Sequence, residues 1–110
     1  MIVIADTTPL ISLMKIGKLG LLKELFHDVY IPEAVYRELT DNPLFENEAL
    51  EIKNCGFIYA RSVDNKRAVG ILRRATGLDV GESEAIVLTD EQQGNLLLMD
   101  EVKGRKISIS

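Results

Sequence analysis

Acidic side chains recur in this sequence where predicted elements of secondary structure meet. Asp6 follows the apolar run Ile2–Ala5, and Asp100 follows the predicted strand at 95–99, which is apolar from Leu96 to Met99. Short apolar runs of this kind are typical of buried strands. If the two strands are parallel, both carboxylates emerge at the carboxyl edge of one sheet, where open α/β sheets bind their ligands.

Two further carboxylates are predicted near the same edge. The helix predicted at 79–93 leads into the strand at 95–99, so Glu82 in its first turn must lie at that end. Glu38 lies about two turns into the helix that begins near Pro32, and its helical phase favours a position leaning towards the core.

Four carboxylates at one edge favour a particular chemistry. Asp6, Glu38, Glu82 and Asp100 would repel one another and raise one another's pKa values. A hard divalent cation such as Mg²⁺ or Mn²⁺, which prefers oxygen ligands, resolves that repulsion. The reaction suited to such a site is phosphodiester hydrolysis, in which the metal binds the phosphate and activates a water.

Each acid also has an ordinary structural interpretation. Asp79 and Glu82 have the spacing of a capping box at a helix start. Asp6 can be a turn former at a strand end, and Asp100 can open a helix whose dipole favours an acid. Glu38 can belong to a solvated surface pair. The coincidence of three acids at one edge shifts the balance towards a metal site.

The elements that must position these acids alternate between strands and helices. The chain has 110 residues, which is the common size of one domain, so we predict a single domain over 1–110. Strands separated by helices need crossover connections, which predicts a three-layer α/β/α fold with a mainly parallel sheet. We expect strands at 2–5, 29–31, 57–60 and 95–99, and helices at 9–15 (capped by Thr8), 18–26, from Pro32, 45–54, 64–76 (capped by Asp64) and 79–93.

Composition excludes several classes of protein. Hydrophobic residues make up 46% of the chain, which is too apolar for intrinsic disorder. The single Cys55 excludes a disulfide scaffold and a cysteine zinc cluster, and it favours a reducing, cytoplasmic compartment. No apolar run approaches the roughly 20 residues of a membrane helix, and the opening residues do not resemble a signal peptide.

The charge pattern bears on nucleic-acid binding. A net charge of −4 argues against broad electrostatic coating of a nucleic acid. The predicted helix at 64–76 nevertheless carries Lys66, Arg67, Arg73 and Arg74 on one face, at a spacing of seven. That face is either an RNA phosphate contact or simply a solvated helix surface.

Four stretches of the sequence, taken in order, carry a family resemblance. They are IVIADTTPL at 2–10, IPEAVYREL at 31–39, LDVGESEAI at 78–86, and LLLMDE at 96–101 followed by Gly104 and Arg105. On these stretches, which cover nearly the whole chain, the protein resembles the PIN-domain family, in the small prokaryotic branch related to VapC-type toxins.

The resemblance implies an activity and a site. Members of this kind are Mg²⁺- or Mn²⁺-dependent endoribonucleases, often inhibited by an antitoxin protein and often homodimeric. It implies Asp6, Glu38, Glu82 and Asp100 as catalytic metal ligands, with Thr7 and Arg105 contacting the RNA substrate. Glu82 stands where many members have Asp. Glu84 is a rival for the same role, which periodicity does not resolve because Ala85 to Leu88 are apolar on all sides.

Two other interpretations compete with the ribonuclease. PIN domains usually continue beyond the fourth acid through a helix, a strand and often a last helix, so the resemblance implies that the last strand and helix are missing here. That length favours a non-catalytic PIN module that binds an antitoxin or RNA without cutting it. A phosphoacceptor receiver domain would need an acidic neighbour beside Asp6 and an Asp after the 57–60 strand, where Arg61 stands instead.

Overall fold

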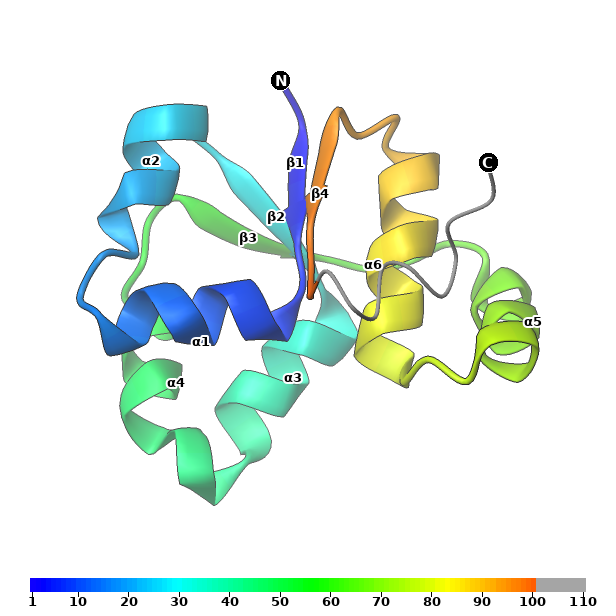
Figure 1. Cartoon of the computed structure of the whole chain (residues 1–110), viewed down its shortest axis with the longest axis horizontal. Helices are drawn as coiled ribbons and strands as arrows, with labels where there is room; N and C mark the ends of the chain where they lie inside the picture. Colours follow the sequence, from blue (N-terminus) through cyan, green and yellow to red (C-terminus); the bar gives the residue numbers. More distant parts are fainter. Residues whose placement is uncertain (101–110) are drawn as a thin grey trace.

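The computed structural model describes residues 1–100, so the predicted substrate contact Arg105 and any element beyond Asp100 lie outside the described residues. The described chain forms four strands and six α-helices (Figure 1). The strands are β1 (Val3–Ala5), β2 (Val29–Pro32), β3 (Ile58–Arg61) and β4 (Leu96–Leu98). The helices are α1 (Thr7–Lys15), α2 (Gly20–Phe26), α3 (Glu33–Asp41), α4 (Glu46–Lys53), α5 (Lys66–Thr76) and α6 (Val80–Glu91), with a short 3₁₀ helix η1 (Pro43–Phe45) before α4.

All four strands are parallel and lie in the order β3-β2-β1-β4. Ala5 at the end of β1 is level with Leu98 at the end of β4, so the two strands reach the carboxyl edge together. The predicted three-layer α/β/α fold with a parallel sheet is therefore confirmed.

Helices cover both faces of the sheet (Figure 1), and the side chains of β1 alternate between the two apolar clusters that result. Val3 and Ala5 belong to the cluster that α1, α2, α3 and α4 complete, whereas Ile4 belongs to the cluster under α5 and α6. All three residues are completely buried. A strand buried on both faces is why the sequence shows a continuous apolar run there instead of an alternating one.

The capping residues of α1 and α5 differ from the sequence-based predictions. Helix α1 begins at Thr7 with Asp6 as its N-cap residue, two residues earlier than a cap at Thr8 would give. The backbone N–H of Asp6 donates to the carbonyl of Leu98 at 2.9 Å, and this bond fixes the point where the chain leaves the sheet. Helix α5 begins at Lys66, because Asn65 rather than Asp64 accepts the hydrogen bond of the first turn.

Within the described residues, no helix is long and apolar enough to cross a membrane.

Candidate active site

Asp6 occupies the junction between β1 and α1 at the carboxyl edge of the sheet. Its side chain is only 3% exposed. A buried carboxylate loses hydration in its charged form, so a charge at this position is costly unless a donor or a cation compensates.

Burial and neighbouring acids raise the pKa of Asp6 from its ordinary 3.8 to about 6. Loss of hydration is the largest cause, and a hydrogen bond from the Thr7 backbone opposes it. The negative charges of Asp79, Glu82 and Glu38 then raise the pKa further. The structure therefore brings Asp6, Glu38 and Glu82 into one electrostatic cluster.

Glu38 is held near Asp6 by Thr7, the residue that follows Asp6. The hydroxyl of Thr7 donates to Oε2 of Glu38 at 2.8 Å. The prediction that Glu38 leans into the core is wrong, because its side chain is exposed. Its carboxylate nevertheless accepts the hydrogen bond from Thr7 of the neighbouring helix α1.

Gly81 marks how closely α3 approaches the start of α6. A Cβ placed on Gly81 would lie 3.5 Å from Oε2 of Glu38 and 3.6 Å from Oδ1 of Asp79. Both carboxylates therefore lie near Gly81, at distances where an added Cβ would make ordinary van der Waals contact with them.

Glu82 takes part in a helix cap as well as in the acidic cluster. Oε1 of Glu82 accepts from the backbone of Asp79 at 2.9 Å, and Oδ1 of Asp79 accepts from the backbone of Glu82 at 2.8 Å. This reciprocal pair is the capping box that the spacing predicted. The same side chain is 4% exposed and close enough to Asp6 to raise its pKa. The capping role and the site role are thus compatible.

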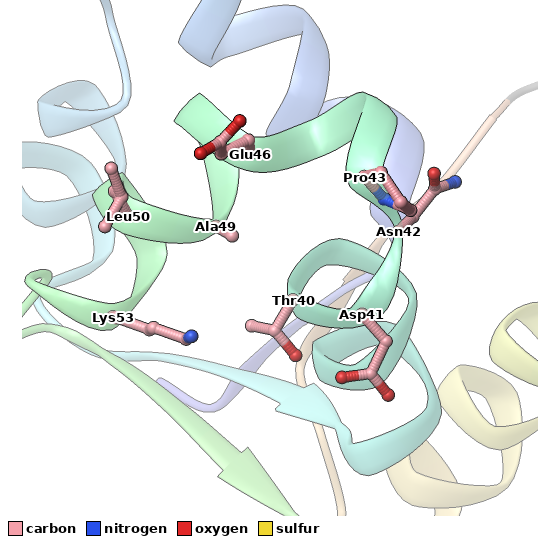
Figure 2. A pocket seen from close by; sticks show the side chains of 8 residues that line it. All are labelled: Thr40, Asp41, Asn42, Pro43, Glu46, Ala49, Leu50 and Lys53. Atoms are coloured by element: carbon pink, nitrogen blue, oxygen red, sulfur yellow. The ribbon is translucent and has the colours of Figure 1, made fainter.

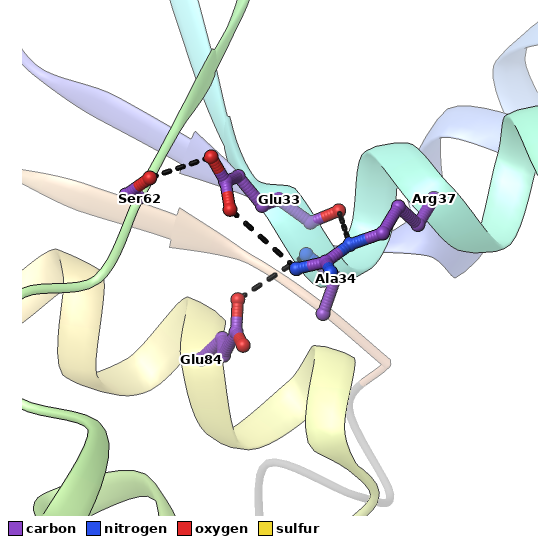
Figure 3. A network of polar contacts seen from close by, with 5 residues as sticks. All are labelled: Glu33, Ala34, Arg37, Ser62 and Glu84. Carbon is purple, nitrogen blue, oxygen red and sulfur yellow. Dashed lines mark hydrogen bonds and ion pairs between the residues drawn. The ribbon is translucent and has the colours of Figure 1, made fainter.

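Glu84 points to a different part of the molecule. Its Oε1 accepts from the backbone of Ala34 at 3.2 Å, at the N-terminal end of α3 (Figure 3). Beside it, Glu33 accepts from Ser62 and pairs with Arg37. Glu84 is not one of the acids that raise the pKa of Asp6. Glu84 therefore joins α6 to α3 by a hydrogen bond, whereas Glu82 faces the acidic cluster.

Two further acids, Asp100 and Asp79, lie near this edge of the sheet. Asp100 lies two residues after β4, at the carboxyl edge, and it is not among the groups that act on the pKa of Asp6. Asp79 has the largest effect of any acid on that pKa, although its spacing to Glu82 suggested only a cap. The sequence did contain a signal for this role of Asp79. It directly precedes Val80, at the start of the helix whose first turn lies at the carboxyl edge of the sheet.

The donor set suits a hard divalent cation, because Asp6, Glu38, Asp79 and Glu82 supply only carboxylate oxygens. Burial is the largest cause of the raised pKa of Asp6, and the charges of the neighbouring acids add to it; a bound cation would relieve that repulsion. Among residues 1–100, however, no three acidic, histidine or cysteine side chains converge as a ligand set. Metal ligation by the four predicted acids therefore stays a prediction.

A separate hollow of about 290 Å³ lies between the end of α3 and α4. Figure 2 shows Lys53 reaching across it towards Thr40, with Asp41 and Glu46 at its rim. None of the predicted site acids lines this hollow. The acidic cluster at the sheet edge is therefore the better candidate for chemistry.

A family model described as a PIN domain matches residues 2–110, which is nearly the whole chain. No curated protein matches the sequence. The family match supports nuclease activity in general, and PIN domains generally depend on a divalent metal.

Proposed function

Since this chain belongs to the PIN-domain family, we propose that it is a metal-dependent endoribonuclease of toxin type. It hydrolyses phosphodiester bonds of RNA with the help of Mg²⁺ or Mn²⁺. The observation that supports this proposal is the buried carboxylate of Asp6, whose pKa is raised to about 6 beside three further acids. A site that concentrates negative charge in this way favours a cation over any neutral ligand.

Asp6, Glu38, Glu82 and Asp100 would hold the metal in this proposal. When bound, the metal supplies Lewis-acid stabilisation of the scissile phosphate and activation of the attacking water. Asp79 adds negative charge from the start of the same helix as Glu82.

The residues of the chain itself position and tune this cluster. Thr7 orients Glu38 through its hydroxyl, and the capping box fixes the carboxylate of Glu82. With a pKa of about 6, Asp6 is mostly ionised at neutral pH and lies close to the point where it takes up a proton. Its burial excludes bulk water from that carboxylate.

The remaining parts of the proposal rest on the resemblance to toxin-type members. They are contact of Thr7 and Arg105 with RNA, inhibition by an antitoxin protein, assembly as a homodimer, and a cytoplasmic location.

Mn²⁺ binding by calorimetry, combined with RNA cleavage, tests the proposal. Asp6→Asn should abolish the Mn²⁺ isotherm and the cleavage while circular dichroism shows an unchanged fold. The matched control is Asp28→Asn, because Asp28 is exposed and precedes β2 at the opposite edge of the sheet. An unchanged isotherm in Asp6→Asn would contradict the assignment of the site.

One observation favours a second candidate, a non-catalytic PIN module that binds an antitoxin or RNA. The carboxylates of Glu38 and Glu82 already accept hydrogen bonds, and no three acids within residues 1–100 converge as metal ligands. RNA binding without cleavage at saturating Mn²⁺ would favour the module. Sustained cleavage that Asp6→Asn removes would favour the enzyme.

A further inference from the structure

Helix α5 carries four basic side chains around a glycine. Lys66, Arg67, Arg73 and Arg74 all lie within α5, and Gly70 is three or four residues from each of them. Residues three and four apart are neighbours on a helix surface, so Gly70 lies at the centre of the four cations. We call this surface the α5 basic face.

The α5 basic face is directed away from the body of the protein. Val69 is buried, and Ala68 and Leu72 pack partly against the apolar cluster under α6. The four cations lie on the other side of the helix and are exposed. The one ion pair between residues of the described chain joins Arg37 to Glu33, so none of the four cations has an ion-pair partner within residues 1–100.

The centre of this face is hollow. Gly70, Arg73, Arg74, Gly77 and Leu78 line a groove of about 470 Å³. A Cβ on Gly70 would meet nothing within 4 Å, so packing does not require glycine there. Glycine disfavours a helix interior, and it commonly occurs where a ligand must approach the backbone closely. Gly70 therefore leaves room at the floor of a positively charged groove.

The first turn of α5 also departs from the usual charge preference. The N-terminal end of a helix carries partial positive charge and favours acids. Helix α5 has no acid in its first turn and begins instead with Lys66 and Arg67. Negative charge at this end comes instead from Glu91 of α6, whose carboxylate accepts hydrogen bonds from the backbone N–H groups of Asp64 and Asn65 at 2.9 and 2.7 Å.

We infer that the α5 basic face binds the sugar–phosphate backbone of single-stranded RNA and leads it to the acidic cluster. This inference rests on the proposed function, whose substrate it positions. Two observations select this ligand. Four cations without an ion-pair partner in residues 1–100 complement a polyanion, and one of the residues that line the groove is Leu78, which directly precedes Asp79 of the acidic cluster in the chain. A chain with net charge −4 needs such a local positive surface to attract RNA.

The first test measures RNA affinity without any metal, so cleavage does not enter the result. Labelled single-stranded RNA is titrated in EDTA, by fluorescence anisotropy, with the wild type and with the double variant Arg73→Gln/Arg74→Gln. Loss of two phosphate contacts should reduce the slope of log affinity against log salt by about 1.4. At about 0.1 M salt, that change in slope corresponds to roughly 25-fold weaker RNA binding by the double variant, and the difference in affinity should vanish towards 1 M salt.

A matched control removes the same charge elsewhere. Lys15→Gln/Lys23→Gln changes two exposed lysines on α1 and α2, which cover the opposite face of the sheet. This control should keep the slope of the wild type. An equal loss in the control would attribute the effect to net charge and overturn the inference.

A second variant tests the groove without changing any charge. Gly70→Leu fills the floor of the groove, and the open space there lets the helix tolerate the side chain. It should weaken RNA binding several-fold, whereas Gly20→Leu, placed in equally open space on α2, should not. Equal affinity of Gly70→Leu and the wild type would contradict a groove at this position.

The outcomes separate the inference from the function that it extends. Unchanged RNA affinity in Arg73→Gln/Arg74→Gln, with cleavage still dependent on Asp6, overturns the inference alone. The expected affinity loss in EDTA, with no Mn²⁺ binding or cleavage, supports the inference and contradicts the proposed nuclease. Polyglutamate that binds as tightly as RNA, and loses affinity equally in the double variant, would assign the face to an acidic protein segment instead.

Discussion

The hydroxyl of Thr7 donates a hydrogen bond of 2.8 Å to Oε2 of Glu38, across 31 positions of the chain. It joins the first turn of α1 to the middle of α3, directly beside Asp6. Glu38 is exposed overall, so this bond is the contact that holds its carboxylate at the acidic cluster.

Thr7→Val keeps the shape of the side chain but removes the hydroxyl. We expect the free energy of unfolding to fall by about 1 kcal/mol. If Glu38 binds the metal, loss of its positioning partner should weaken Mn²⁺ binding by roughly 10- to 100-fold. Calorimetry at pH 7.5 measures the affinity. Thr8→Val is the control, because Thr8 is exposed in the same helix turn and should leave the affinity unchanged.

Asp6 should make the stability of the metal-free protein depend on pH. Its pKa rises from 3.8 to about 6 on folding, so the folded state holds the proton more tightly than the unfolded state. The resulting stability is fully present below about pH 3.8 and is lost as the pH rises through 6. The free energy of unfolding of Asp6→Asn should therefore exceed that of the wild type by up to about 3 kcal/mol at pH 8, and by little at pH 3.5.

Urea unfolding in EDTA at the two pH values measures this difference. The comparison with the variant cancels the titration of other groups. An equal effect of Asp6→Asn at both pH values would show that the carboxylate titrates normally.

Glu82 and Glu84 should separate cleanly in metal binding. Glu82 faces Asp6, so Glu82→Gln should weaken Mn²⁺ binding by at least about tenfold, a free-energy change of roughly 1.4 kcal/mol. Glu84→Gln keeps an oxygen for the backbone of Ala34 and should bind Mn²⁺ like the wild type. Calorimetric titrations of both variants decide the assignment. Loss of binding in Glu84→Gln alone would reverse it.

Gly70 within α5 and Gly77 directly after it should respond in opposite ways to substitution by alanine. Gly70→Ala meets open space in a helix interior and should raise the free energy of unfolding by roughly 0.5 to 1 kcal/mol. Gly77→Ala should lower it by about 1 kcal/mol, because Gly77 ends the helix with a φ of +75°, in the left-handed region. Thermal or urea unfolding compares the two. A loss of stability in Gly70→Ala would mean that packing requires that glycine.

The sequence predicted the layers of the fold because local and long-range signals agree there. A strand buried on both faces must be apolar throughout, and the run at 2–5 has that pattern. The glycine after α5 also ends the helix where predicted, because the left-handed conformation favours that residue. Two helix starts were less predictable. The bond from Asp6 to Leu98 joins residues far apart in sequence, and local capping preferences at Thr8 contain no trace of it.

The sequence by itself determined that Asp6, Glu82 and Asp100 reach one edge of the sheet. In a parallel sheet, every strand end and every helix start that leads back into the sheet meet at one edge. Tertiary structure alone decided which of these acids face one another. Glu82 and Glu84 lie on a helix that is apolar on all sides, so its periodicity does not separate them. The contact of α6 with α3 does, because the N–H of Ala34 binds Glu84 and leaves Glu82 at Asp6. Burial of Asp6, which raises its pKa, likewise arises only when β1, α3 and α6 close around it.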